Sequence, residues 1–299
     1  MSSYLYGFFW NNGIEHFDFC YTYNNDATRY TLNTQYINNI DITKLSTIEL
    51  YNIKVDSLYD KFCLLPFETL IINNCKIGTI ENLSTNKNVK KIIINESDIK
   101  NLEKLNDMNV EKLIIINSKN IYINDTLVFK KLIELEYTSN TIDFIPNFEC
   151  LENLIVLKLA NNKIKDINNM GILKNLISLD LSNNDIENID ILEKYNKLKY
   201  LHINNNKIKN IQPIQNNSNM KFLNLSNNNI DSIDSIQKFE DIEILNILNN
   251  PIYYLPDLMK FKHLDFDNLK INWNNIKDVK GMKGFGLIKN IIKTIINKN

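Results

Sequence analysis

The chain has 299 residues, enough for two ordinary domains, and its hydrophobic fraction of 44% supplies ample material for a core. Its net charge of −1 excludes a strong overall field that would attract nucleic acid or an anionic membrane. Arg29 is the only arginine beside abundant lysine, asparagine and isoleucine. This composition indicates an AT-rich genome, such as that of a large DNA virus, an amoeba or an intracellular parasite.

The start of the chain gives no sign of secretion. Residues 1–10 form a short apolar run with no basic residue before it and no small-residue cleavage site after it, so we expect no signal peptide. No apolar run approaches the length of a membrane span. Cys20, Cys63, Cys75 and Cys150 lack C-x-x-C spacing, which favours reduced structural thiols over a disulfide or metal framework.

Residues 1–44 carry no repeat and are rich in aromatic side chains. The alternation of Phe17, Phe19 and Tyr21 with polar neighbours predicts a half-buried strand. A stack of repeats needs a cover over the apolar end of its first coil. We therefore expect residues 1–44 to form an aromatic-rich N-terminal cap.

From residue 45 to about residue 272 the sequence repeats the frame L-x-x-L-x-L-x-x-N-x-I-x-x-I-x-x-L. We count ten repeats of good or fair quality and a degenerate eleventh. The asparagine of the frame recurs every 22 residues at six positions: Asn140, Asn162, Asn184, Asn206, Asn228 and Asn250. Nearer the N-terminus the equivalent positions hold Ile53, Cys75 and Ser97. The fourth repeat is one residue short, which predicts a local irregularity near Asn120.

Each repeat predicts one strand, a bend and a return segment. The alternation of Leu179 and Leu181 has a period of two, which is typical of a strand with its leucines on one side. The apolar spacing then lengthens to three, so the chain turns and returns along the far side of a coil. Asn184 falls at the bend, where its amide can bond backbone groups of its own coil and the next. Stacked copies then share a core that one copy cannot form alone.

This frame resembles that of leucine-rich-repeat proteins with 22-residue repeats, a class that includes the bacterial internalins and the repeat-built regulatory subunit of protein phosphatase 1. The resemblance implies an α/β solenoid, a right-handed coil of about ten to eleven repeats with a concave parallel β-sheet, and we expect a cap at both ends. The chain accordingly divides into a cap (1–44), a leucine-rich-repeat solenoid (45–272) and a C-terminal capping helix (273–299). The motif does not identify a partner, because function lies in sites built onto a fold.

The last segment differs in composition from the repeats. Gly281, Gly284 and Gly286 indicate a turn, and apolar residues follow at helical spacing from Phe285 to Ile296. We expect this helix to cover the last coil. As an alternative, its lysines could form a basic amphipathic face for a membrane surface.

The sequence lacks the patterns of catalysis. His16, His202 and His263 lie far apart, and in a solenoid distance in sequence becomes distance in space beyond a coil or two. No phosphate loop, nucleophile elbow, zinc-protease motif or dinucleotide fingerprint occurs. We therefore expect a protein that is not an enzyme and that has no cofactor, no metal and no nucleic-acid partner.

The positions beside and between the strand leucines should point away from the core, onto the concave sheet. Two apolar clusters occur there, although solvation alone would favour polar residues. The first cluster comprises Ile71, Ile93, Ile114 and Ile116. The second, with its polar rim, gives the candidate partner-binding residues: Tyr200, His202, Phe222, Asn224, Ile244, Asn246 and Leu248. Contiguous exposed apolar area usually marks an interaction site. The alternative is that composition and β-propensity place isoleucine on strands without a function.

The sequence thus predicts a non-enzymatic, monomeric and cytoplasmic protein–protein interaction module that binds a partner protein in its concave face. A host-directed binding protein of a virus or parasite, located in the host cytoplasm, fits this prediction. One alternative is a regulatory or scaffold subunit of a phosphatase or other enzyme, and another is a peripheral membrane effector that uses the basic C-terminal helix. A catalytic N-terminal segment is a weaker alternative, because 44 residues are too few for an enzyme domain.

Overall fold

The computed structural model describes residues 4–10, 16–22, 31–32 and 46–280, except residues 53, 59–62, 101, 107, 119–120, 122, 124, 126–127, 266 and 268. The chain divides into two compact units. The first unit comprises Met1–Thr141 and Pro146–Leu154, and the second comprises Ile142–Ile145 and Ile155–Asn299. Each unit contains stacked coils with one strand of a main sheet per coil.

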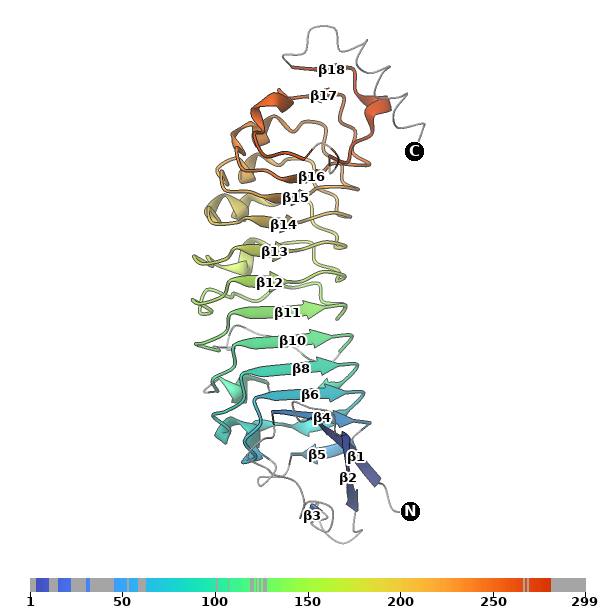
Figure 1. Cartoon of the computed structure of the whole chain (residues 1–299), viewed down its shortest axis with the longest axis vertical. Helices are drawn as coiled ribbons and strands as arrows, with labels where there is room; N and C mark the ends of the chain where they lie inside the picture. The colour runs from blue at the N-terminus through green and yellow to red at the C-terminus, as the bar shows by residue number, and fades with distance from the viewer. Residues whose placement is uncertain are drawn as a thin grey trace. The chain divides into compact units, whose positions relative to one another are not determined.

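Five parallel strands form the main sheet of the first unit (Figure 1). They are β4 (Thr47–Tyr51), β6 (Thr69–Asn73), β8 (Lys91–Asn95), β10 (Lys112–Ile116) and β11 (Glu134–Thr138). Neighbouring strands pair in register, so equivalent repeat positions lie side by side. Alternate side chains are buried because one face of the pleat meets the core.

On the return side of the first unit, the described residues include a smaller parallel sheet and two short 3-10 helices. The sheet consists of β5 (Lys54–Ser57), β7 (Lys76–Thr79) and β9 (Asp98–Ile99). The helices are η3 (Glu81–Thr85) and η4 (Leu102–Leu105). The irregularity predicted near Asn120 lies outside the described residues.

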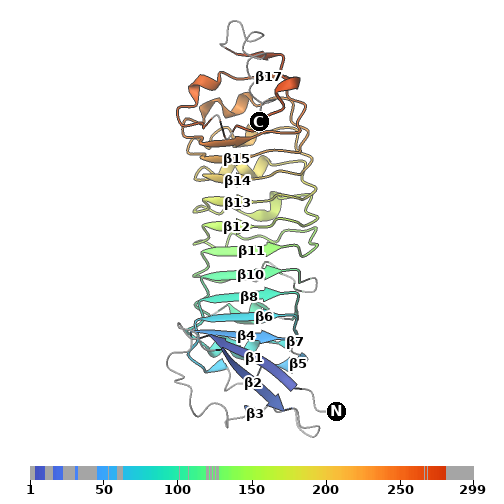
Figure 2. The ribbon, with the colours of Figure 1, turned by 45° about the vertical axis from the view of Figure 1, so that its right-hand side comes forward.

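Among the described residues before the repeats, three strands run antiparallel to their neighbours. The strand predicted around Phe19 is β2 (His16–Thr22), which pairs with β1 (Tyr4–Trp10) and with β3 (Thr31–Leu32). β1 also pairs with β4 (Figure 2), in a register that sets Phe8 opposite Glu49. The backbone of residues 4–10 thus extends the main sheet of the first unit by edge pairing.

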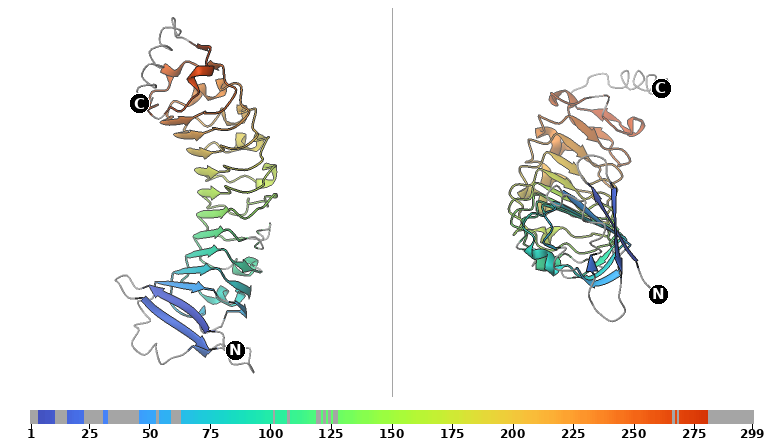
Figure 3. Two further views of the ribbon diagram at one scale, coloured as in Figure 1. Left: turned by 90° about the vertical axis from the view of Figure 1, so that its right-hand side faces the viewer. Right: turned by 60° about the horizontal axis from the view of Figure 1, so that its bottom comes forward.

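The main sheet of the second unit has five shorter parallel strands, again in register. They are β12 (Val156–Lys158), β13 (Ser178–Asp180), β14 (Tyr200–His202), β15 (Phe222–Asn224) and β16 (Ile244–Asn246). The return segments contain the 3-10 helices η5 (Asn168–Met170), η6 (Asp190–Lys194), η7 (Gln212–Ile214) and η8 (Asp234–Lys238). Strands line one side of the coils, and return segments line the other (Figure 3).

The second unit continues past β16 into an irregular coil. Lys270 forms a parallel bridge with Asn246, at the place of the predicted degenerate repeat. The 3-10 helix η9 (Leu258–Lys260) precedes this bridge, and η11 (Trp273–Asn275) follows it. β17 (Tyr254–Leu255) pairs with β18 (Asp278–Val279). Of the segment 273–299 predicted as a capping helix, residues 273–280 contain η11 and β18, and the stretch from Phe285, for which helical spacing predicts a helix, lies outside the described residues.

The repeated asparagine bonds to the backbone of two adjacent coils. Asn184 Nδ2 donates to the carbonyl oxygen of Leu159 at 3.0 Å in the preceding coil. It also donates within its own coil to Leu181 O at 2.9 Å and Ser182 O at 3.2 Å. Its Oδ1 accepts the backbone N–H of Ile164 at 3.0 Å. The same set of bonds recurs at Asn206, Asn228 and Asn250.

In the coils that precede Asn140 in the first unit, smaller side chains take this place at Ser118, Ser97 and Cys75. Ser118 N–H donates to Asn140 Oδ1 at 2.7 Å, and Ser97 N–H donates to Ser118 Oγ at 3.1 Å. Cys75 N–H then donates to Ser97 Oγ at 2.9 Å. The chain of bonds is therefore continuous from Asn140 to Cys75.

A second column of asparagines holds the backbone in a left-handed turn. The residue before each repeated asparagine in the second unit has a positive φ, for example 56° at Asn183 and 55° at Asn205. Asparagine tolerates this region better than other non-glycine residues because its short side chain can bond locally. Here the side chains also bond to each other, since Asn205 Nδ2 donates to Asn183 Oδ1 at 2.6 Å. The spacing of the sequence repeat alone does not reveal this role.

Replacing Asn184 with alanine removes the bonds that satisfy a buried bend. We expect Asn184→Ala to lower the free energy of unfolding by about 1–3 kcal/mol. Asn219→Ala, at an exposed position, is the matched control and should change it by less than about 0.5 kcal/mol. Chemical denaturation followed by circular dichroism measures both, and equal losses in the two variants would contradict this role for Asn184.

The left-handed column gives a separate prediction. Asn183→Val places a β-branched side chain at positive φ and should cost about 1–2 kcal/mol, whereas Asn183→Gly should keep most of the stability. Thermal melting of the two variants provides the comparison. A valine variant as stable as the glycine variant would show that the backbone does not need the left-handed conformation.

Candidate binding surface

The predicted partner-binding residues lie on three adjacent strands of the second unit. β14, β15 and β16 pair so that Tyr200, Phe222 and Ile244 occupy one register position. His202, Asn224 and Asn246 occupy the next outward position, and Leu248 lies just beyond the end of β16. We call these seven residues the Tyr200 patch. Leucines at 201, 223 and 245, between the two outward positions, are fully buried on the core side.

An aromatic centre dominates the Tyr200 patch. Tyr200 has 42% of its surface exposed, and Phe222 and Ile244 are half-buried. The His202 ring stacks on the Phe222 ring, with 4.4 Å between centroids and 27° between planes. Such packing restricts the motion of both rings.

The two asparagines of the patch are oriented by the turn that follows each strand. Asn224 Oδ1 accepts the Ser226 N–H at 3.2 Å and its hydroxyl at 2.9 Å. Asn246 Oδ1 accepts the Leu248 N–H at 3.2 Å. Because the oxygen of each amide is engaged, the Nδ2 end is the part that remains to donate to a partner. The patch therefore combines apolar surface with a row of hydrogen-bond donors.

The turn after each of these strands has a short sequence pattern that is not part of the repeat frame. Asp180 Oδ1 accepts the Ser182 N–H at 2.9 Å and the Ser182 hydroxyl at 2.6 Å, as Asn224 does with Ser226. Asp or Asn followed two residues later by Ser is the typical spacing for a side chain that bonds the backbone of its own turn. Ser182 and Ser226 are buried, so at these two positions the side chains do not lie on the open face as the strand pattern predicted.

An ion pair borders the aromatic centre. Lys221 Nζ lies 2.7 Å from Glu243 Oε1, and these residues directly precede Phe222 and Ile244. The hydrogen bond to Glu243 and the carboxylate's charge raise the pKa of Lys221 above its ordinary value. Both side chains are substantially exposed, so the pair contributes little to stability. It instead places both signs of charge at the rim of the patch.

The first apolar cluster lies on the outward face of the first unit. Ile71, Ile93 and Ile114 occupy one register position on β6, β8 and β10, and Ile116 lies at the end of β10. All four are half-buried. We call Ile71, Ile93 and Ile114 the isoleucine column.

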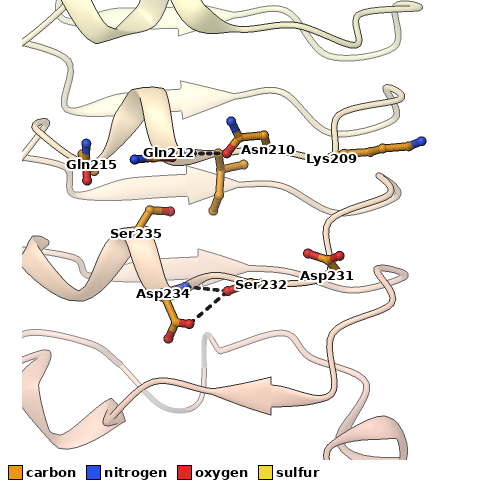
Figure 4. Close-up of a pocket in the computed structure, with 9 residues that line it drawn as sticks. Lys209, Asn210, Gln212, Gln215, Asp231, Ser232, Asp234 and Ser235 are labelled. Atoms are coloured by element: carbon orange, nitrogen blue, oxygen red, sulfur yellow. Dashed lines mark hydrogen bonds between the residues drawn. The ribbon is translucent and has the colours of Figure 1, made fainter.

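The return side of the second unit has a shallow depression between two coils, with a volume of about 580 Å³. Figure 4 shows its polar lining between η7 and η8, with Lys209 extending away from the other side chains. Asn210 Oδ1 accepts the Gln212 N–H at 2.9 Å, and Ser232 Oγ accepts the Asp234 N–H at 3.2 Å. These groups serve local turns, so the depression offers little specific chemistry for a ligand.

Other candidate chemistry is sparse in the described part of the chain. Within it, no group of three or more His, Cys, Asp or Glu residues is placed to hold a metal ion. No helix there has the length and apolar character needed to cross a membrane. Cys63 and Cys75 are buried thiols outside any disulfide, and burial raises the pKa of the partly exposed Cys150 thiol.

Comparison with known proteins relates this fold to that of leucine-rich-repeat proteins. A family model described as leucine-rich repeats (2 copies) matches residues 174–216. An internalin (inlF) from Listeria monocytogenes is 18% identical with a TM-score of 0.56, over 85% of this chain and 90% of that one. A leucine-rich-repeat protein from Leptospira interrogans is 21% identical with a TM-score of 0.63, over 77% of this chain and 60% of that one. No curated protein matches the sequence significantly.

A plant receptor shows the same fold in a longer chain. The plant peptide hormone receptor RGFR1, in complex with RGF2, is 16% identical with a TM-score of 0.55. The match covers 77% of this chain and 39% of the receptor. The fold is therefore that of a leucine-rich-repeat solenoid, whose parallel sheet is its concave side. Residues 174–216 thus match leucine-rich repeats in sequence, and the fold is similar to that of an internalin. Such repeats typically form protein-interaction modules.

Proposed function

We propose that the chain is a non-enzymatic module that binds a partner protein through the Tyr200 patch. The observation that carries this proposal is the alignment of Tyr200, Phe222 and Ile244 on adjacent strands of an outward face. Neighbouring strands lie about 4.8 Å apart, so the three side chains form one contiguous stripe. A solvated face without a partner would favour polar residues at these positions.

The composition of the patch fits the centre of a protein interface. Aromatic side chains packed in the middle of an interface contribute most of the binding energy, and a polar rim excludes water around them. Here Tyr200 and Phe222 form the centre, and the Nδ2 groups of Asn224 and Asn246 border it. The complex between RGFR1 and RGF2 supports the proposal only as an example of this fold in a receptor with a bound ligand.

The contacts within the patch support binding rather than catalysis. A nucleophile would need a nearby base to activate it. The His202 ring packs on Phe222, and the nearby hydroxyls of Ser182 and Ser226 donate to Asp180 and Asn224 instead. The contacts of these side chains therefore stabilise the conformation of the surface.

Removing the aromatic centre tests the proposal. Partners are first captured from a cell extract with the parent protein and identified by mass spectrometry, and their binding is then measured directly. We expect Tyr200→Ala with Phe222→Ala to weaken the identified complex at least a hundredfold, because two central anchors are lost. The melting temperature should change little, since neither side chain supports the core.

Lys165→Ala with Lys209→Ala is the control, because both lysines are exposed and lie outside the patch. This control variant should bind the partner as the parent does. If the aromatic double variant also retains parental affinity while folded, the partner binds elsewhere and the proposal fails.

A further inference from the structure

One polar residue lies in the core of the second unit at a position that is otherwise aliphatic or aromatic. Before each of the strands β13 to β16 the coil closes with a tight turn, and the residue at the start of this turn is buried. Its carbonyl oxygen accepts the N–H three residues later, as Asn217 O accepts Met220 N–H at 3.0 Å. The equivalent residues of the neighbouring coils are Leu173, Tyr195 and Phe239.

The side-chain amide of Asn217 is hydrogen-bonded at one end only. Asn217 Nδ2 donates to the carbonyl oxygen of Tyr195 in the preceding coil at 2.7 Å. The residue is 0% exposed, and no donor among the described residues bonds to its Oδ1. A flipped amide would set Oδ1 against the Tyr195 carbonyl oxygen, so the bond from Nδ2 fixes the orientation. A buried acceptor in this state lacks the hydrogen bond that it makes to water when the chain is open.

Asn86 shows how an asparagine at this position can be satisfied. Asn86 and Asn217 each lie five residues before a strand, β8 and β15 respectively. Asn86 Nδ2 donates to Leu65 O in the preceding coil at 2.9 Å, and its Oδ1 accepts the N–H of Asn88 at 2.9 Å. Asn219 is the counterpart of Asn88 but makes no bond to Asn217 Oδ1. The position therefore accepts asparagine, and the coil of Asn217 differs by leaving the acceptor without a donor.

The return segment around Asn217 is weakly bonded to its neighbours. Among residues 209–220, all of which the structure describes, the bond from Asn217 Nδ2 is the only hydrogen bond to another coil. The helix η7 has 3 residues, whereas η6 and η8 have 5 each. The depression of about 580 Å³ lies between η7 and η8, with Gln212 on one coil and Ser235 on the next (Figure 4). This side of the coil is therefore less closely covered than the sheet side.

Hydrogen bonds to neighbouring coils fix the chain on both sides of this segment. Before it, Ile208 N–H donates to Asn228 Oδ1 at 3.0 Å. After it, Phe222 N–H donates to Lys199 O at 3.0 Å. Between these two points the segment is held closed mainly by its buried apolar side chains, Ile211, Ile214 and Met220.

We propose that residues 209–220 open as a local unit while β14 and β15 stay paired, and that Asn217 controls how often they open. Opening breaks one hydrogen bond between coils and lets water reach both ends of the Asn217 amide, so the unsatisfied acceptor lowers the free energy of opening. In a stack of repeats, the stability of one coil depends on its own residues and on its two neighbours. One coil can therefore open without the rest of the stack.

The opening gives the Tyr200 patch a means of adjustment, a consequence that rests on the proposed function. Packing on the return side holds each coil at its angle to the next. Tyr200 lies on the strand before the segment and Phe222 on the strand after it, at one register position. Loosening the return side between these strands allows their angle, and with it the spacing of the two side chains, to change when a partner binds.

Hydrogen exchange of the full chain, measured for each amide by nuclear magnetic resonance, tests the proposal without a partner. The amides of Ile214, Asn217 and Met220 donate within the segment. Their protection factors should be at least about tenfold lower than those of the equivalent amides in the two adjacent coils, because local opening exposes them. These equivalents are Leu192, Tyr195, Leu198, Ile236, Phe239 and Ile242. The Leu225 amide, which donates to Asn246 O, should stay protected.

A substitution at Asn217 tests its role in the opening. Asn217→Leu introduces the residue type of Leu173 and removes the unsatisfied acceptor, so the protection factors of the segment should rise at least about tenfold. The melting temperature should rise as well. Asn217→Met is a second variant whose flexible side chain adapts if leucine fits poorly. Asn216→Leu is the matched control, because it makes the same change at an exposed neighbouring position, and it should exchange as the parent does.

Three results would overturn the proposal. The first is that the segment in the parent protein is as well protected as the adjacent coils. The second is fast exchange that both Asn217 variants leave unchanged, which would assign the opening to the short η7. The third is faster exchange and a lower melting temperature in both variants, which would show that a water molecule satisfies Oδ1 in the core. Loss of the proposed function would leave all these measurements unaffected, because none involves a partner.

Discussion

The buried bend after each strand is the constraint on which the stack depends. At that point the backbone leaves the sheet inside a core that contains no bulk water to satisfy its polar groups. Asn184 supplies the missing partners in two adjacent coils, and Asn183 bends the chain through positive φ one residue earlier. The two adjacent asparagines therefore have different roles: the side chain of Asn184 bonds to the backbone, and Asn183 adopts the left-handed conformation of the bend. Only with both requirements met can the leucines of successive coils pack into one core.

The outward positions of the same strands are released from this constraint. The inward positions of each strand, such as Leu201 and Ile92, must hold apolar residues that pack in the core. The side chains beside them contribute little to the core and can vary. The first unit places isoleucine at the centre of its outward face, as at Ile93. The second unit places a histidine against an aromatic ring, at His202 and Phe222. One frame thus carries two surfaces of different chemistry.

Periodicity explains how far the sequence predicts this structure. A spacing of 22 residues makes equivalent positions obvious, so the strands, the buried leucines and the outward columns follow from it. The left-handed conformation of Asn183 could not be predicted, because asparagine is common throughout the chain. Only its φ of 56° in the structure distinguishes this residue. The orientation of Asn224 depends on a bond to Ser226 that the repeat frame does not contain. A partner's contacts leave no periodic signal, so the sequence gives candidate surfaces but cannot rank them.

The coils differ in length, and the difference falls on the return side. The step from Ser97 to Ser118 is 21 residues, yet β8 and β10 remain in register. The step from Asn246 to Lys270 is longer, and the two residues still form a parallel bridge. Insertions and deletions can therefore accumulate in the return segments while the strands stay aligned. A loop grafted there would alter what the back of a coil touches without displacing side chains on the sheet, so the two sides of this protein are free to evolve separately.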